Sequence, residues 1–196
     1  MSNVKNTRNV AVAGILSAAA FVLMLFDFPI PFLLPTFIKF DFSDFPALLG
    51  AFALGPVYGI LIELVKNLLH CLFSGSFGIG ELSNFLLGAV FSGTAGMLYR
   101  KDKTKRGAMI GAVAGAFAMA VFSVPSNYLI VYPVYYNFMP EATILAAYQA
   151  ILPGVKSIFT SLLLFNMPFT FVKGMLDVLI TFLLYKRLSP LLHGNG

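Results

Sequence analysis

Residues 44–73 have the sequence DFPALLGAFALGPVYGILIELVKNLLHCLF, an apolar stretch that is interrupted once, at Gly55-Pro56. A proline removes a helix hydrogen bond and disfavours helix at the residue before it. The stretch is therefore predicted to form two helices, residues 44–54 and 57–73, of about 16 Å and about 25 Å at 1.5 Å per residue. Whether they make one membrane crossing or two decides the topology of the whole chain.

The composition around this stretch is that of an integral membrane protein. The 196 residues are 59% hydrophobic and 11% charged, with 21 Phe, no Trp and one Cys. Soluble globular domains have about 25% charged and about 45–50% apolar residues. The composition excludes a soluble domain, a disordered chain and, because Cys71 has no second cysteine to pair with, a disulfide-stapled secreted module. We predict a single membrane domain, residues 1–196, surrounded by lipid bilayer.

Four further segments are apolar enough to approach the roughly 20 residues that a membrane-spanning helix needs. They are residues 10–28, 81–99, 107–131 and 168–185. The first follows Lys5 and Arg8, as a cleaved signal peptide would, but its small residues lie within the apolar run and not after it, which favours a retained span. Between the spans we expect a loop at 29–43 and, within the mixed segment 132–167, a short helix around 141–151.

The positions of the basic residues indicate whether residues 44–73 cross the membrane once or twice. Nine of the 13 lie in three clusters, Lys5/Arg8, Arg100/Lys101/Lys103/Lys105/Arg106 and Lys186/Arg187. The positive-inside rule places all three on the cytoplasmic side, so an even number of crossings must separate them. That holds before Arg100 only if Gly55-Pro56 divides two spans. We therefore predict an all-α, six-transmembrane-helix bundle of the plasma membrane with a short second span and both termini cytoplasmic. The net charge of +5 then reports orientation, and no nucleic-acid binding is predicted.

This topology gathers polar side chains at one membrane face. Just inside the outer ends of spans four (81–99), five (107–131) and six (168–185) lie Asn84, Asn127, Thr170 and Lys173. Asp41 lies in the first outer loop. Polar groups within hydrocarbon usually face a cavity or the bundle interior. We predict a pocket that opens to the outside. From the residues alone two alternatives stay open: Asn84 and Asn127 as hydrogen-bonding residues between helices, and Lys173 as a side chain that snorkels outward.

A second polar set lies deeper. Glu63, Lys66 and Asn67 share one face of span three, and Asp177 follows Lys173 by one helical turn. Ion pairs satisfied inside the bundle are the favoured interpretation. The alternative is a proton or sodium relay, which would make the chain a self-sufficient, ion-coupled secondary transporter of a small apolar or aromatic solute.

The sequence predicts no catalytic residue, no metal site and no cofactor. The adjacent His70 and Cys71 point apart on a helix, and no Gly-x-x-x-x-Gly-Lys-Ser/Thr phosphate loop occurs. Asp41 and Asp44 form the only close pair of acids. We therefore expect no enzyme, and a small membrane enzyme or scaffold is the weaker alternative.

Small residues recur at helical spacing in the first span. Ala13 and Ser17 form one i, i+4 pair, and Gly14 and Ala18 form another. Such faces allow a second helix to approach closely, either within the bundle or from a partner subunit.

Five blocks of sequence then occur in order. They are Asp41-Phe42-Ser43-Asp44-Phe45-Pro46; Gly55-Pro56-Val57-Tyr58-Gly59 with Glu63 and Lys66-Asn67; Ser83-Asn84-Phe85; Asn127-Tyr128 with Pro133 and Tyr135; and Pro168-Phe169-Thr170-Phe171-Val172-Lys173-Gly174. In these blocks the chain, from about residue 10 to 188, resembles the riboflavin-specific substrate-binding (S) component of the energy-coupling factor (ECF) vitamin transporters.

The resemblance implies a subunit that captures riboflavin or a related flavin from outside and delivers it inward. Its partners would be an ECF transmembrane coupling subunit and two ATPase subunits, docked on the small-residue face of span one (Gly14, Ala18, Ala13 and Ser17).

The resemblance also implies ligand contacts for Asn127 and Lys173, with Asn84 a weaker match. Phe40, Asp41 and Tyr128 complete the predicted substrate site near the outer face. The family's Pro-Phe-Asn-x-x-Lys-Gly has Thr170 in place of the Asn, and a hydroxyl cannot make the paired donor and acceptor contact of an amide.

Overall fold

Four helices are long and apolar enough to cross a membrane in the computed structural model, which describes residues 2–75 and 78–193. The first is α1 (Ser2–Met24) and the second is α4 (Ile79–Lys101). The third joins α5 (Lys105–Ser126), η1 (Asn127–Val131) and α6 (Tyr132–Tyr135), and the fourth joins α8 (Ile158–Ser161), η2 (Leu162–Asn166) and α9 (Met167–His193). The segments η1 and η2 are π-helical turns.

The predicted break at Gly55-Pro56 is confirmed. It separates α2 (Phe45–Ala53) from α3 (Pro56–His70), and Gly55 adopts φ 112°, a left-handed conformation that glycine takes without a steric penalty. Pro56 follows as the first helical residue, where its missing N–H costs no hydrogen bond. At 1.5 Å per residue α2 is about 14 Å long and α3 about 22 Å long.

Two helices continue past a proline at which a predicted span begins or ends. The helix expected to start at Pro168 begins at Ile158, and the one expected to end near Val131 continues to Tyr135, past Pro133. In each case a π turn comes just before the proline, with Tyr132 N–H bonded to the Asn127 carbonyl and Met167 N–H to the Leu162 carbonyl. Because a π turn shifts the hydrogen-bond ladder by one residue, the helix passes the proline without ending.

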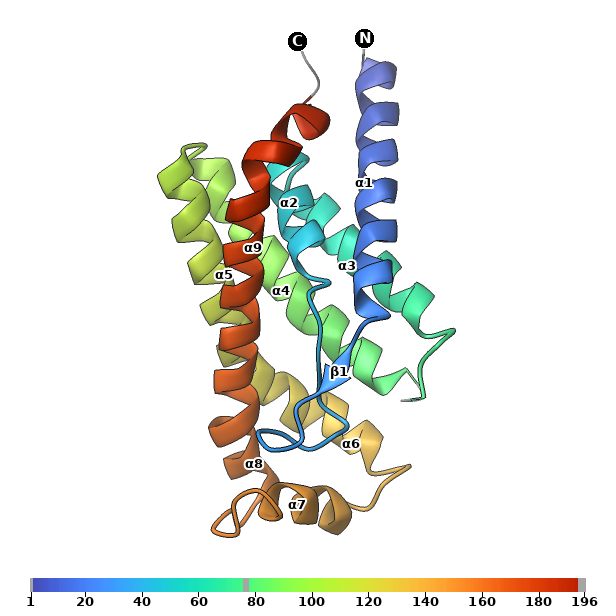
Figure 1. The fold of residues 1–196 in the computed structure, drawn as a ribbon, viewed down its shortest axis with the longest axis vertical. Helices are drawn as coiled ribbons and strands as arrows, with labels where there is room; N and C mark the ends of the chain where they lie inside the picture. The colour runs from blue at the N-terminus through green and yellow to red at the C-terminus, as the bar shows by residue number, and fades with distance from the viewer. Residues whose placement is uncertain (1, 76–77, 194–196) are drawn as a thin grey trace.

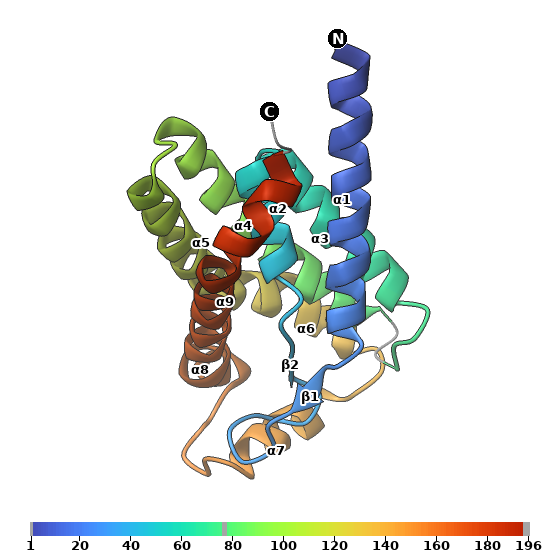
Figure 2. The same ribbon diagram turned by 45° about the horizontal axis from the view of Figure 1, so that its top comes forward.

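The remaining elements cover one end of the bundle, which we call the α7 end. It holds α7 (Glu141–Gln149) and an antiparallel pair of two-residue strands, β1 (Phe28–Pro29) and β2 (Lys39–Phe40), in which Phe28 lies opposite Phe40. The helix was predicted and the strands were not. Figures 1 and 2 show the start of α1 and the finish of α9 together at the opposite end, the terminal end.

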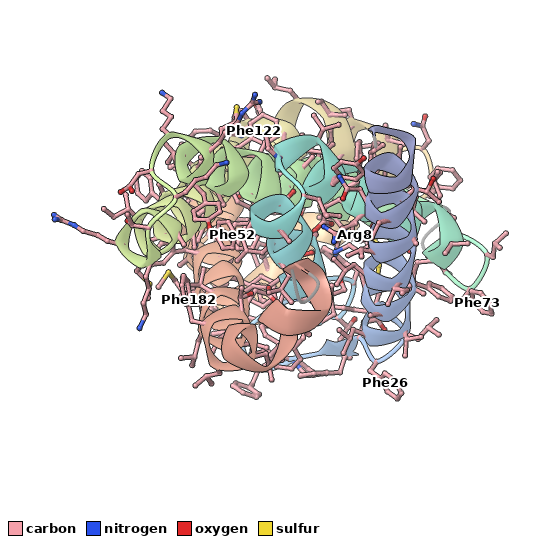
Figure 3. The ribbon with its side chains drawn as sticks, turned by 90° about the horizontal axis from the view of Figure 1, so that it is seen from above. Arg8, Phe26, Phe52, Phe73, Phe122 and Phe182 are labelled. Atoms are coloured by element: carbon pink, nitrogen blue, oxygen red, sulfur yellow. The ribbon has the colours of Figure 1, made fainter. Side chains whose placement is uncertain are left out.

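The core forms where α4, α5, α9 and α2 meet. Small residues on α5 allow α4 to come close: a Cβ at Gly115 would lie 2.6 Å from the Phe91 carbonyl oxygen. Phe52 of α2 fills the layer beside them and packs edge-on against Tyr99, 5.0 Å between ring centroids. Figure 3 shows Phe52 among the helices, whereas Phe26 and Phe73 extend from the periphery, where they are 73% and 67% exposed.

The two small-residue pairs of α1 face different ways. Ser17 is buried with its hydroxyl bonded to the Ala13 carbonyl at 2.8 Å, and Ala13 packs on a core cluster with Leu16 and Ile62. Gly14 and Ala18 are exposed, and no atom lies within 4 Å of a Cβ built on Gly14. Of the four residues of the predicted docking face, Ser17 is therefore internal, Ala13 is half-buried against the core, and Gly14 and Ala18 are exposed.

Candidate functional site

A cavity of about 520 Å³ extends from the α7 end into the middle of the bundle. This volume lies within the range of small-molecule sites. The lining comes from every long helix and from the segment between α1 and α2: Met24, Asp27, Phe37, Ile38, Lys39, Asp41, Asp44, His70, Ser74, Gly75, Gly80, Glu81, Ser83, Asn84, Leu87, Met119, Asn127, Val131, Tyr132, Tyr135, Phe138, Met139, Asn166, Phe169, Thr170 and Lys173.

Most predicted site residues reach this cavity although they come from distant parts of the chain. Those that line it are Asp41, Asn84, Asn127, Thr170 and Lys173. Phe40 does not: it is 6% exposed and packs behind the wall residue Phe169, 6.1 Å between ring centroids. Phe40 therefore supports the wall instead of forming it.

Tyr128 also lies outside the cavity, contrary to its prediction as a substrate contact. It is 45% exposed and packs against Phe159 on the outside of the bundle. Consecutive residues of a helix point about 100° apart. With Asn127 turned inward and 4% exposed, its neighbour must therefore face outward.

The inner end of the cavity is held by a charged network centred on Asp44, which precedes α2. Lys173 of α9 donates to Asp44 Oδ2 at 2.7 Å, and Lys66 of α3 donates to Asp44 Oδ1. Lys66 also lies 2.8 Å from Glu63 Oε2 and donates to Ser43 Oγ at 2.7 Å. One carboxylate thus joins three helices, and the internal ion pair predicted for Glu63 and Lys66 is confirmed.

Asp41 extends this network to the segment before α2. Its Oδ1 accepts from the Ser43 backbone N–H at 2.8 Å and from the Ser43 hydroxyl at 2.5 Å. Its Oδ2 accepts from Asn84 Nδ2 and lies near Lys173 Nζ, both at 3.4 Å. Lys173, 7% exposed, is turned into the bundle, so the snorkelling alternative was wrong.

Asp177 stands apart from these pairs. It is fully buried, and within residues 2–75 and 78–193 neither of its carboxylate oxygens has a hydrogen-bond partner. The predicted pairing with Lys173 is not found, because the Lys173 ammonium is directed to Asp44 and Asp41 instead.

Asn127 begins the π turn η1 and is fixed in two directions. Its Nδ2 donates to the Ser123 carbonyl at 2.8 Å, and its Oδ1 accepts from the Ser83 hydroxyl of α4 at 3.0 Å. The two interpretations left open by the sequence therefore both hold for this residue, since it joins two helices and also lines the cavity.

A neutral network at the α7 end was missed by the sequence analysis. Tyr132 of α6 and Tyr148 of α7 bring their hydroxyls to 2.5 Å, and the Tyr148 hydroxyl donates to Asn166 Oδ1 at 2.6 Å. Asn166 was overlooked because the last helix was expected to start two residues after it. Its signal was an isolated amide in an apolar run, one helical turn before Thr170.

A further missed pair lies where α3 ends and α4 begins. His70 Nδ1 is 2.7 Å from Glu81 Oε1, and both side chains are buried and line the cavity. This contact fixes the end of α3 to the start of α4, on either side of the connection between the two helices.

Metal binding is not indicated, since the described residues contain no group of three or more His, Cys, Asp or Glu that could hold an ion.

The site as a whole suits a neutral molecule with a flat aromatic part. Phe37, Tyr135 and Phe169 provide apolar wall, and amides and hydroxyls provide directed hydrogen bonds. The single ammonium of Lys173 faces two carboxylates, so the inner end offers no uncompensated positive charge to an anion.

Comparison with known proteins agrees with this description. A family model described as the substrate-specific component of ECF transporters matches residues 8–185. The chain belongs to this family. A substrate-specific component of a transporter is a membrane protein and not an enzyme, and the four long apolar helices fit that class.

Two curated relatives and one solved structure are similar to this chain over almost its whole length. The riboflavin transporter RibU of Staphylococcus aureus (strain TCH60) is 36% identical over 190 residues, 97% of this chain and 95% of that protein. The riboflavin transporter FmnP of Bacillus subtilis (strain 168) is 31% identical and covers 93% of each chain. A solved S component of a bacterial ECF transporter is 34% identical with a TM-score of 0.75, covering 96% of this chain and 98% of that one.

Proposed function

We propose that this chain is the riboflavin-capturing subunit of an ECF transporter and that riboflavin binds in the 520 Å³ cavity. The observation that carries the proposal is the convergence of Asn84, Asn127, Thr170 and Lys173 on that cavity from separate helices. The riboflavin transporters of S. aureus and B. subtilis, to which the chain is similar over nearly its whole length, support it.

The chemistry of riboflavin matches the lining. The vitamin is uncharged, with a flat tricyclic ring that carries two carbonyl groups and with a polyhydroxyl tail. Aromatic wall residues suit the ring, and the amides and hydroxyls of Asn127 and Thr170 suit its polar edge and tail. A neutral ligand also fits an inner end where Lys173 is already balanced by Asp41 and Asp44.

The most direct test uses the colour of the ligand. Protein purified in detergent from cells grown in rich medium should be yellow and should show flavin absorbance. Ligand-free protein should quench the fluorescence of added riboflavin, and a colourless preparation that leaves this fluorescence unchanged would contradict the proposal. Flavin mononucleotide, which adds a phosphate, tests whether the site rejects an anion.

For the membrane arrangement we propose six crossings, with α2 and α3 as separate spans and with both termini in the cytoplasm. The short α2 and α3 lie between longer helices of the same bundle, and the start of α1 and the finish of α9 share one end (Figure 1). Such a plasma-membrane protein would open its cavity to the outside at the α7 end. Single cysteines, in a background in which Cys71 is replaced, test this: Lys103→Cys should resist a membrane-impermeant thiol reagent in intact cells, and Lys156→Cys should react.

For the partner surface we propose the exposed Gly14/Ala18 strip of α1, docked on the ECF transmembrane coupling subunit that two ATPases drive. Gly14 and Ala18 leave room for a close helix approach. Ala18→Trp should abolish assembly and riboflavin uptake while leaving riboflavin affinity within about twofold. Ala19→Trp, on an exposed neighbouring position, is the matched control. Unchanged assembly in Ala18→Trp, measured by co-purification, would overturn this surface.

A further inference from the structure

The last polar group before α9, the side chain of Asn166, lines the cavity and has an amide donor to offer. Asn166 is 7% exposed and lines the cavity at the end of η2. Its Oδ1 accepts the Tyr148 hydroxyl proton at 2.6 Å. The Asn166 side chain is also within hydrogen-bond reach of the Tyr132 hydroxyl, and an amide nitrogen carries two N–H bonds, so at least one of them remains for whatever fills the cavity.

The two tyrosines fix the direction of this amide. A tyrosine hydroxyl has one proton, and the proton of Tyr148 is committed to Asn166. In the 2.5 Å contact between the hydroxyls, Tyr148 must therefore accept and Tyr132 must donate. Burial raises the pKa of the Tyr148 hydroxyl well above its ordinary value, so this proton stays in place at any physiological pH. The chain from Tyr132 through Tyr148 therefore holds Oδ1 in place, and the amide plane of a residue that lines the cavity is fixed with it.

Asn166 and Thr170 are neighbours on the cavity side of the same helix. Both side chains line the cavity, and residues four apart on a helix lie about 5–6 Å from each other. Thr170 has one hydroxyl, which offers a single donor, whereas the Asn166 amide offers two N–H bonds in a fixed plane. Of the two, Asn166 is the better placed to recognise an oxygen acceptor directionally.

We propose that Asn166 determines substrate specificity by donating an Nδ2–H hydrogen bond to an oxygen of the bound flavin, with Tyr148 as the residue that positions it. This proposal rests on the proposed riboflavin function. The acceptor is either a ring carbonyl or a tail hydroxyl, which are both oxygen acceptors. A ligand with no oxygen at this point leaves a buried donor unpaired and binds more weakly.

The test is a fluorescence-quenching titration of purified, ligand-free protein with riboflavin and with lumiflavin, which keeps the ring but lacks the polyhydroxyl tail. Asn166→Asp keeps the acceptor for Tyr148 and the size of the side chain but removes both donors. It should weaken riboflavin binding about tenfold or more. Asn137→Asp is the matched control, because Asn137 is exposed and does not line the cavity; it should stay within about twofold.

Lumiflavin distinguishes the two acceptors. An equal loss for riboflavin and lumiflavin in Asn166→Asp assigns a ring carbonyl, and a loss confined to riboflavin assigns a tail hydroxyl. Either result supports the proposal. Asn166→Ala decides the matter if Asn166→Asp does not fold, as judged by ligand-free thermal unfolding. Riboflavin affinity within about twofold of wild type in the folded variants would overturn it.

The positioning role of Tyr148 has a separate readout. Tyr148→Phe should weaken riboflavin binding about threefold in the wild-type background and should have no effect in Asn166→Ala. Equal losses in both backgrounds would show that Tyr148 does not act through Asn166. A wild-type chain that binds no flavin would instead refute the proposed function, so the two failures are distinguishable.

Discussion

The two ends of the cavity are built from opposite kinds of polar chemistry. At the inner end Asp44 holds the charged side chains of Lys66 and Lys173, and at the α7 end Tyr132, Tyr148 and Asn166 form a neutral chain. Both networks are buried, but the cost of breaking them differs. A charge left alone in a protein interior is several times more costly than an unpaired hydroxyl. The inner end is therefore expected to hold the bundle together, and the α7 end to set the choice of ligand.

The largest effect is expected from Asp44→Ala. This change leaves two buried ammonium groups without their shared carboxylate, and the free energy of unfolding should fall by about 5 kcal/mol. The measurement is ligand-free thermal or denaturant unfolding in detergent. Asp27→Ala is the control, since the Asp27–Lys39 pair is exposed on the Lys39 side (49%) and should cost about 1 kcal/mol or less. If Asp44→Ala and Asp27→Ala lost the same unfolding free energy, the charged network at the inner end would not be what holds the bundle together.

A smaller loss of stability, about 3 kcal/mol, is expected from Lys173→Met, because Lys66 remains to pair with Asp44. Riboflavin affinity should fall about tenfold or more, since the variant removes a charged donor from the cavity. Calorimetric titration measures the second effect. Lys156→Met, at an exposed position beyond the cavity, should change neither quantity, and a Lys173 variant with wild-type affinity would restrict Lys173 to a structural role.

At the α7 end Tyr132→Phe removes the proton donated to Tyr148 and should cost about 1 kcal/mol of unfolding free energy. Tyr136→Phe, a half-buried hydroxyl on the same segment, should cost less than about 0.5 kcal/mol. Thermal unfolding of both variants in parallel measures the difference. A loss as large as that of Asp44→Ala would show that the neutral network also supports the fold.

The smallest effect is expected from Asp177→Asn. The Asp177 carboxylate has no hydrogen-bond partner among residues 2–75 and 78–193, so its neutral isostere loses no hydrogen bond there. Stability should be unchanged or higher, because an amide of the same size cannot become charged in a site that already holds more acids than bases. Destabilisation by more than about 1 kcal/mol in thermal unfolding would reveal a partner for this carboxylate.

Two features could be predicted from the sequence, the helix end at Gly55-Pro56 and the gathering of polar side chains at one cavity. Gly55-Pro56 marks a helix end because the required backbone conformation is available there to glycine and because the proline cannot donate. The convergence of Asn127 and Lys173 on one cavity followed from topology, without knowledge of any contact.

The spans that end at Val131 and begin at Pro168 were predicted too short for one physical reason, which is that a proline was taken to end a helix. At Pro133 and Pro168 a π turn compensates for the missing hydrogen bond, and no residue type in Asn127–Val131 or Leu162–Asn166 announces such a turn. Asn166 was missed for this reason. The strands β1 and β2 were also unpredictable, because a two-residue pair depends on where α1 and α2 place its ends.

The two π turns also mean that a one-residue deletion within a helix would change the shape of the cavity. A π turn is an α-helical turn with one residue inserted, so the helix on either side is offset in phase by about 100°. Deleting one exposed residue of η2, such as Leu164, would shorten no loop. It would rotate the preceding turn and carry the buried Ile158 away from the core while Lys173 stayed with Asp44. Evolution and engineering can therefore re-aim one end of this site by an indel within a helix and leave the other end unchanged.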